Sequence, residues 1–368
     1  MKISFPHMGH SYVALKWLVE NTGHECIVPP EPSSRTLDLG VRHSPEFACI
    51  PFKILMGTYL EVIEKGAEVI LTSGSKGPCR AGLYWVMHQY ILEELDVGVK
   101  VVAFEPPLCD LKDFFQKIRW VRKTGGLSLK EFVQVLRVTW EKLKAIDEIE
   151  KLSHEIRPYE TNRGETTRKL WQALDMLDAA NNEVDVEDAL QEGQKLLQGV
   201  SQDRSRNPLK IGIIGEIYVV LEPAANHYIQ IMLGEMGVLT DRSIYLSSYT
   251  SKNTIENREG DVLEVAKPYL GEAPIGGHGA NSIGETILYA QNGFDGIVQL
   301  APFACIPEIV AKSIMPAVSR DHGIPVLTLF IDEQTSKAGV QTRLEAFVDL
   351  LDKRRQVKAK RGIERLVI

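Results

Sequence analysis

The sequence predicts an α/β protein with two parallel-sheet domains and a helical subdomain between them. Short apolar segments alternate with helical patterns in residues 1–109, and the same alternation returns in residues 208–352. Strands that alternate with helices pair in parallel, and the helices cover both faces of the sheet. Residues 110–207 show helical spacing without a convincing strand, and a basic tail of residues 353–368 ends the chain.

The first domain is expected to contain four strands, each a short apolar run bounded by turn residues. They are Lys2–Phe5, Glu25–Val28, Glu68–Thr72 and Val99–Phe104. Helices are expected at Tyr12–Asn21, Pro51–Lys65 and Arg80–Leu95, with a loop before the second of them. Gly23 marks the end of the first helix, because glycine readily adopts the left-handed conformation that closes a helix.

The middle segment predicts a helical subdomain followed by a polar linker at residues 202–208. Apolar residues recur there at the three- and four-residue spacing of one helix face. They are Phe132, Leu136, Trp140, Leu143, Leu170, Leu174, Leu177, Leu190 and Leu197. A stripe of this kind usually packs into a core, although it could also line a cofactor.

The second α/β domain repeats the pattern of the first. Its expected strands are Lys210–Ile214, Gly296–Leu300 and Pro325–Phe330. Its expected helices are Asn226–Met236, Ile283–Tyr289, Pro307–Ser319 and Gln341–Arg354. Ligands of open parallel sheets collect beyond the carboxyl ends of the strands, so polar residues and cysteines that follow these strands are candidate site residues.

The composition is that of an ordinary globular protein and argues against two classes of partner. Of 368 residues, 44% are hydrophobic and 25% are charged, and the net charge is −7. A chain with this acidic balance is not expected to bind nucleic acid or a membrane surface. We see no secretory signal and no apolar run long enough to span a bilayer, so a cytoplasmic location is expected. The five cysteines are then expected to be free thiols, redox groups or metal ligands.

One pentapeptide occurs twice, as Phe47-Ala48-Cys49-Ile50-Pro51 and as Phe303-Ala304-Cys305-Ile306-Pro307. In both copies a proline follows the cysteine by two residues, and a helical pattern follows the proline. Proline suits the first turn of a helix, where its missing N–H costs nothing. Each cysteine should therefore lie at a helix N-terminus, where the dipole favours a thiolate. Cys79 also comes just before a predicted helix.

Cys49, Cys79 and Cys305 are candidate ligands of a [4Fe–4S] cluster. None belongs to a CxxC pair, which disfavours a zinc ribbon or a ferredoxin-type run. Three thiolates at convergent loop ends would leave one iron open, and an open coordination position suggests reactivity, as it does for catalytic zinc. The alternative is that all three are buried structural cysteines, which behave as small hydrophobic residues.

The other two cysteines are weaker candidates. Cys26 lies inside a predicted strand, which favours a role in core packing. Cys109 follows Pro106-Pro107 after the fourth strand, where it is a spare ligand, a redox neighbour or an ordinary loop residue.

Glu216 and His278 are the candidate catalytic residues. Glu216 follows the first strand of the second domain, at the edge where ligands collect, and its alternative role is helix capping. His278 lies in the glycine-rich turn at residues 276–282, where it could donate a proton near the cluster or have a structural partner. The turn could bind an anion through its N–H groups, but it lacks the Walker A ending and the Rossmann spacing. Arg80 could offset the charge of thiolates, or it could simply be solvated.

Motifs in both α/β domains resemble a known superfamily. The C-terminal part of the chain is similar to that of the 2-hydroxyacyl-CoA dehydratase component D and benzoyl-CoA reductase superfamily. The similar segments are Ala301–Glu308, Gly323–Pro325 and Thr342–Phe347, with Asp332 between the last two. Three further segments resemble a narrower branch of this superfamily, the CoA protein activase or acyl-CoA dehydratase activase-related proteins. They are Pro45–Lys53, Gly77–Arg80 and Gly215–Tyr218.

The resemblance implies two flavodoxin-like lobes that hold an iron–sulfur cluster through three cysteines, which match Cys49, Cys79 and Cys305 here. It also implies that single electrons arrive from a separate ATPase of the Hsp70/actin/sugar-kinase fold, and that the chain could form a homo- or heterodimer. Dehydratases of the superfamily use the electron to make a ketyl radical on an acyl-CoA thioester, and related members reduce small molecules. The chain lacks Hsp70-type ATPase motifs, so ATP hydrolysis is expected of the partner.

The leading hypothesis is an iron–sulfur redox protein that passes low-potential electrons from this activator to a substrate, either an acyl-CoA or another small molecule. A second hypothesis is a cluster carrier or scaffold subunit that is not itself an enzyme. A third is a nucleotide-binding regulator that uses the glycine-rich turn.

Overall fold

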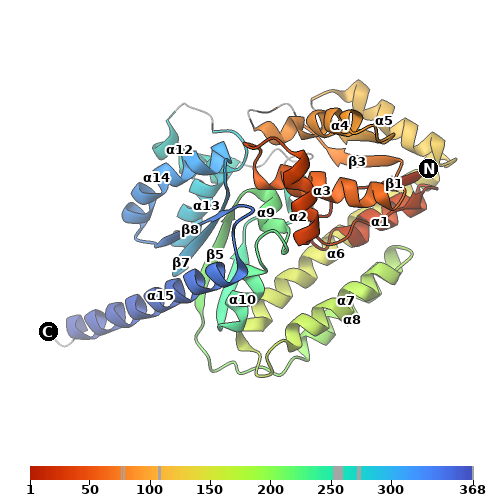
Figure 1. The fold of residues 1–368 in the computed structure, drawn as a ribbon. Helices are drawn as coiled ribbons and strands as arrows, with labels where there is room; N and C mark the ends of the chain where they lie inside the picture. Colours follow the sequence, from red (N-terminus) through yellow and green to blue (C-terminus); the bar gives the residue numbers. More distant parts are fainter. Residues whose placement is uncertain (76, 78, 107–108, 252–259, 272–274, 367–368) are drawn as a thin grey trace.

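Two four-stranded parallel sheets lie at the centre of two α/β domains, and a helical segment packs beside them (Figure 1). The structure is a computed structural model that describes residues 1–75, 77, 79–106, 109–251, 260–271 and 275–366. Pro78 and Pro107 of the sequence analysis lie outside these residues. The predicted α/β class with two parallel-sheet domains is confirmed.

The two sheets share one topology. The strand orders are β2-β1-β3-β4 and β6-β5-β7-β8, so in each domain the first strand lies between the second and the third. This is the order of the first four strands of a flavodoxin-like sheet, and its ligand crevice opens between the first and third strands. The strands are β1 (Lys2–Ser4), β2 (Glu25–Cys26), β3 (Val69–Ser73), β4 (Lys100–Phe104), β5 (Leu209–Gly215), β6 (Val238–Arg242), β7 (Gly296–Pro302) and β8 (Val326–Ile331).

The first domain contains one helix that the sequence analysis takes for a loop. Its helices are α1 (Tyr12–Asn21), α2 (Ser34–His43), α3 (Ile50–Glu64), η1 (Arg80–Leu83) and α4 (Tyr84–Glu94). The unpredicted helix is α2, which begins with a capping box between Ser33 and Thr36. It packs very closely on α3, because a Cβ atom at Gly40 would lie 1.8 Å from the Lys53 carbonyl oxygen.

The middle of the chain is helical, as expected, and the described residues from 110 to 205 contain no strand. Its helices are α5 (Leu111–Thr124), α6 (Leu129–Ile156), η2 (Arg157–Tyr159), α7 (Glu165–Ala179) and α8 (Glu183–Gln198). Most of the apolar stripe is buried, and Leu170, Leu174 and Leu177 share a core cluster with Val13 of α1. Leu136 departs from the expectation, because it is exposed.

The second domain contains a strand, β6, that the sequence analysis does not predict. Its helices are α9 (Ile217–Leu221), α10 (Ile229–Glu235), α11 (Leu246–Thr250), α12 (Gly260–Leu270), α13 (Gly279–Gln291), α14 (Ile306–His322) and α15 (Lys337–Leu366). Helix α15 continues from the domain through the basic run and projects away from the rest of the fold (Figure 1).

Helix α3 belongs to the first domain by sequence but packs into the core of the second. Ile50 and Ile54 share a core cluster with Ile211, Ile213 and Val298 of the second sheet. An ion pair between a buried lysine and an exposed glutamate joins the same helix to the second domain, because the Lys53 Nζ lies 3.1 Å from the Glu333 carboxylate. The N-terminus of α3 therefore lies between the two domains. In the described part of the chain, no helix has both the length and the apolar character that crossing a bilayer requires.

Candidate functional site

All three candidate cysteines are N-cap residues. Cys49 precedes α3, Cys79 precedes η1 and Cys305 precedes α14, and all three have extended backbone conformations. None of the thiols forms a regular capping hydrogen bond. A backbone N–H of the first turn nevertheless lies close enough to each thiol to lower its pKa in part. The sequence prediction of cysteines at helix N-termini therefore matches the local geometry.

The two pentapeptides present their side chains in the same way. Cys49 and Cys305 are 6% and 5% exposed, whereas Phe47 and Phe303 are 75% and 60% exposed. The copies differ at the residue before the cysteine, since Ala304 has a left-handed backbone with a φ of 63°. Such a conformation is unfavourable for alanine, so the surrounding structure must hold it.

Cys49 lies close enough to Cys79 and to Cys305 for electrostatic interaction, and all three thiols interact with one carboxylate. Cys79 raises the pKa of Cys49, and Cys49 raises the pKa of Cys305. Glu216 raises the pKa of all three. Residues from two domains, separated by more than two hundred positions in the chain, thus converge on one place.

A direct hydrogen bond connects the loops of the two domains at this place. The Arg80 guanidinium donates to the Ala304 carbonyl oxygen at 2.9 Å. It thereby fixes the residue after Cys79 against the residue before Cys305. This contact is also a physical reason for the unusual backbone of Ala304.

Glu216 lies at the ligand crevice of the second sheet. It follows Gly215, the last residue of β5, and its N–H donates to the Leu300 carbonyl of β7 at 3.1 Å. Gly215 has a φ of 136°, and a Cβ atom there would lie 2.1 Å from the Leu300 carbonyl oxygen, so glycine is required. Glu216 is also the N-cap of α9, where its carboxylate accepts from the Val219 N–H at 3.0 Å. Capping and placement at the crevice are therefore both present.

Burial determines the protonation states of the three thiols and of Glu216. It raises the pKa of Cys49 to about 11 and the pKa of Glu216 to about 7, and it also raises the pKa of Cys79 and Cys305. The three thiols are therefore neutral at physiological pH when no cation is bound. A bound metal would change this, because a coordinating thiol loses its proton outright.

Tyr84, which the sequence analysis missed, makes the closest contact with a candidate cysteine. Its hydroxyl is hydrogen-bonded to the Cys49 sulfur. The ring packs edge-on against Phe52, which stacks on the buried ring of His88 at a centroid distance of 4.1 Å. Tyr84 comes five residues after Cys79, and nothing in that spacing indicates a contact with Cys49.

A second buried carboxyl group lies in the first turn of α14. Glu308 accepts hydrogen bonds from the Ser282 hydroxyl at 3.0 Å and from the Gln299 amide at 2.9 Å. Burial raises its pKa to about 7. It also raises the pKa of Cys305, so it belongs to the electrostatic surroundings of the thiols.

The glycine-rich turn abuts the thiol site, and the ring of its histidine packs against a tyrosine. A Cβ atom at Gly277 would lie 3.6 Å from the Cys79 Cβ. The His278 ring packs against Tyr249 at a centroid distance of 5.3 Å, and burial lowers its pKa to about 4. A Cβ atom at Gly279 would lie 2.5 Å from the Pro307 carbonyl oxygen. The glycines therefore serve close packing on α14, and this contact does not favour the nucleotide hypothesis.

Cys26 and Cys109 are not among the residues that shift the pKa of the three thiols. Cys26 is half-buried in β2, and burial raises its pKa to about 12. The N–H of Cys109 donates to the Pro106 carbonyl at 2.8 Å.

The donor set of the three cysteines suits a soft metal centre. Thiolates are the ligands of iron–sulfur clusters, and the three cysteines come from three separate elements of the fold. As they stand, the described residues contain no group of three or more His, Cys, Asp or Glu side chains that could hold a metal ion. The supporting observation is therefore that Cys49 interacts electrostatically with Cys79 and Cys305 and that Glu216 interacts with all three thiols; it is not a finished coordination shell.

A family model described as 2-hydroxyglutaryl-CoA dehydratase, D-component, matches residues 22–351 of the chain. The comparison with curated proteins gives no match. The matched segment includes all three candidate cysteines, Glu216 and His278.

Proposed function

Because this chain belongs to the 2-hydroxyglutaryl-CoA dehydratase D-component family, we propose that it is an iron–sulfur redox component of a dehydratase- or reductase-type enzyme. In this proposal Cys49, Cys79 and Cys305 hold a [4Fe–4S] cluster between the two α/β domains. With the cluster bound, the protein would relay low-potential electrons from a separate ATP-hydrolysing activator to an acyl-CoA or another small molecule. The convergence of the three thiols around Glu216 is the observation that carries the proposal.

When bound, the cluster would supply one-electron chemistry at low potential. The surrounding residues have roles that do not depend on the details of that chemistry. Burial of Cys49 and Cys305 keeps water from the sulfurs, and the Tyr84 hydroxyl is placed to donate to one of them. Arg80 holds the two cysteine loops together. Glu216, with a pKa of about 7, is suited to take up or release a proton near neutral pH.

An apolar surface around the thiols supports a protein partner. Phe47, Leu83, Phe303 and Ile306 are all more than half exposed, and each lies within four residues of a candidate cysteine. Exposed apolar side chains gathered at a site are typical of a surface that another protein covers. We propose that the activator, with the Hsp70/actin/sugar-kinase fold, docks here, and that a second subunit completes a homo- or heterodimer.

Anaerobic reconstitution of single cysteine variants tests the ligand assignment. Cys49→Ser, Cys79→Ser and Cys305→Ser should each lower the bound iron and sulfide and alter the EPR spectrum, because each removes one thiolate ligand. Cys26→Ser is the matched control and should retain the iron of the native protein, since Cys26 lies apart from the three thiols. Equal iron in all four variants, or a native protein that stays free of iron, would refute the assignment.

Turnover distinguishes an enzyme from a cluster carrier. The reconstituted protein is mixed with the activator, ATP, a reductant and a candidate acyl-CoA. Product formation that requires ATP supports the enzyme, whereas a reduced cluster without product supports a carrier or scaffold subunit.

A further inference from the structure

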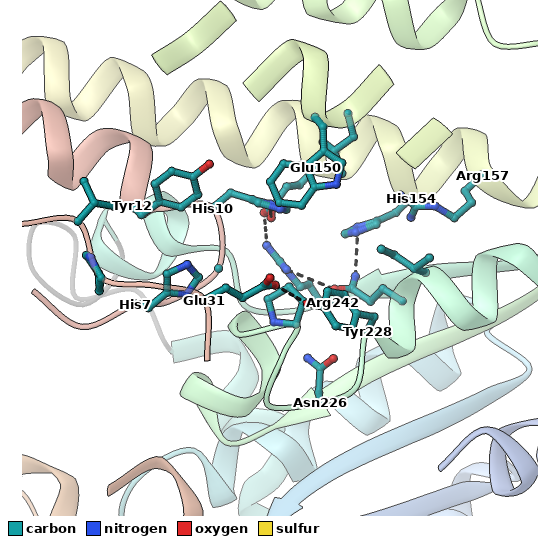
Figure 2. Close-up of a pocket in the computed structure, with 18 residues that line it drawn as sticks. His7, His10, Tyr12, Glu31, Glu150, His154, Arg157, Asn226, Tyr228 and Arg242 are labelled. Atoms are coloured by element: carbon teal, nitrogen blue, oxygen red, sulfur yellow. Dashed lines mark hydrogen bonds and ion pairs between the residues drawn. The ribbon is translucent and has the colours of Figure 1, made fainter. Parts of the chain in front are cut away.

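A pocket of about 220 Å³ lies at the junction of all three parts of the chain, apart from the three cysteines. Its walls come from the loop after β1, the C-terminal half of α6, the start of α7, and the segment from α9 to β6 (Figure 2). The residues that line it include His10, Glu150, Arg157, Trp171, Tyr228 and Arg242. We call it the Arg157 pocket.

Most charges in the Arg157 pocket are paired. The Glu150 carboxylate bonds the His10 ring at 2.6 Å and forms an ion pair with the Arg242 guanidinium. Glu31 accepts a hydrogen bond from the Tyr228 hydroxyl. Figure 2 shows these groups gathered around the pocket, with Glu150, His154 and Arg157 following one another along α6 and its end. The carboxylates therefore already have partners and do not need a ligand.

Arg157 is the exception. It is 1% exposed, and none of its three guanidinium nitrogens has a hydrogen-bond partner among the described residues. The two carboxylates that interact electrostatically with Arg157 are bonded to other groups: Glu160 accepts from the N–H groups of Gly164 and Thr166, and Glu235 pairs with Arg163. A buried cation without a partner is unfavourable, so the native fold carries it at a cost to stability.

The surrounding structure holds Arg157 in this position. A Cβ atom at Gly234 of α10 would lie 2.7 Å from the Arg157 Cδ, so the arginine stem occupies space that only a glycine leaves free. Burial lowers the pKa of Arg157 to about 10, which still leaves it charged at neutral pH. A rigidly held guanidinium prefers an anion with two oxygens placed to accept two of its hydrogen bonds, such as a carboxylate or a phosphate.

The other residues that line the pocket favour an anion that also carries an apolar organic group. Trp171, Leu170 and Ile231 line the pocket, and the Trp171 ring stands edge-on to His10 at a centroid distance of 5.1 Å. Concave sites with mostly apolar walls and a few fixed polar groups are typical of small-molecule sites. We propose that the Arg157 pocket binds a small organic anion, whose carboxylate or phosphate group accepts hydrogen bonds from Arg157 and whose apolar part packs against Trp171.

Isothermal titration of the native protein with three probes tests the proposal. Benzoate combines a carboxylate with a planar apolar ring, benzamide has the same shape without the charge, and inorganic phosphate is an anion without the apolar body. We expect benzoate to bind with one-to-one stoichiometry and benzamide not to bind. Phosphate that binds more tightly than benzoate would also support the site and would identify phosphate as the preferred anion.

Two arginine variants locate the binding. Arg157→Met should weaken the binding of the anion by about tenfold or more, which is the expected loss of a hydrogen bond to a charged group. The matched control is Arg137→Met, a change of an exposed arginine on α6 that does not line the pocket, and it should bind as the native protein does. Without ligand, Arg157→Met should unfold at a temperature equal to or above that of the native protein, because methionine has a similar length and no charge to desolvate.

Three outcomes would overturn the proposal. They are benzamide binding as tightly as benzoate, unchanged anion binding by Arg157→Met, and no binding of either anion at millimolar concentration. The last result would mean that the pocket holds solvent alone. The test leaves the three cysteines untouched, so its failure would not bear on the proposed redox function.

Discussion

Replacing Arg242 with methionine is expected to destabilise the protein strongly at neutral pH. Arg242 and Glu150 form a buried ion pair between β6 and α6, with side chains 3% and 7% exposed. The pair therefore joins the second sheet to the helical segment. In the variant the Glu150 carboxylate stays buried and keeps only His10 as a partner.

The size of the effect follows from the pKa of Glu150. Burial alone would raise this pKa, but Arg242 and His10 more than offset it and hold it at about 2, compared with an ordinary value of 4.5. That difference corresponds to about 3 kcal/mol of stability. Removing one partner of a buried ion pair typically costs about 3–5 kcal/mol, which agrees.

The loss of stability in Arg242→Met should depend on pH, because Glu150 titrates differently in the two proteins. In the native protein the folded pKa of Glu150 lies below the unfolded one, so its contribution is complete above about pH 4.5 and is lost as the pH falls toward 2. In Arg242→Met, burial dominates and raises the folded-state pKa of Glu150. As the pH falls, Glu150 is protonated, and the variant regains part of its free energy of unfolding. The stability gap between the two proteins should therefore be widest at neutral pH and narrow on acidification.

Urea unfolding measured from about pH 8 to about pH 4 checks this. The double variant Arg242→Met with Glu150→Leu is the control, because it removes both charges and should recover most of the lost stability. A gap that stays constant over this pH range, or a double variant as unstable as the single one, would refute the reasoning.

Two other predictions concern packing and the thiol site. Gly40→Ala should lower the free energy of unfolding by about 1–3 kcal/mol, because its Cβ would press on the Lys53 carbonyl and separate α2 from α3. In Gly98→Ala no atom lies within 4 Å of the new Cβ, so the free energy of unfolding should change by less than about 0.5 kcal/mol in the same urea titration. Tyr84→Phe should make the reduction potential of a reconstituted cluster more negative, since a hydrogen bond to a ligand sulfur favours the reduced state. An EPR-monitored redox titration measures this, and Tyr90→Phe, an exposed tyrosine on the same helix, should leave the potential unchanged.

The fold was largely predictable because its main features are local. Helix α1 has the predicted bounds, and the proline after each repeated cysteine marks the start of α3 and of α14. Strand β6 escaped prediction because it ends in two charged residues, Asp241 and Arg242, and aspartate is depleted in strands. The Arg242 side chain is buried there because Glu150, on a helix ninety-two residues away, neutralises it.

The chain's own periodicity, its prolines and its cysteine positions determined that two parallel sheets form and that three thiols lie at helix N-termini. These properties depend on neighbours a few residues apart, which a sequence displays directly. The tertiary structure decided which distant groups meet: Tyr84 with Cys49, Arg80 with Ala304, and Arg157 with no partner in the described chain. Contacts of this kind depend on how whole helices and sheets pack, and that packing forms both the thiol site and the Arg157 pocket.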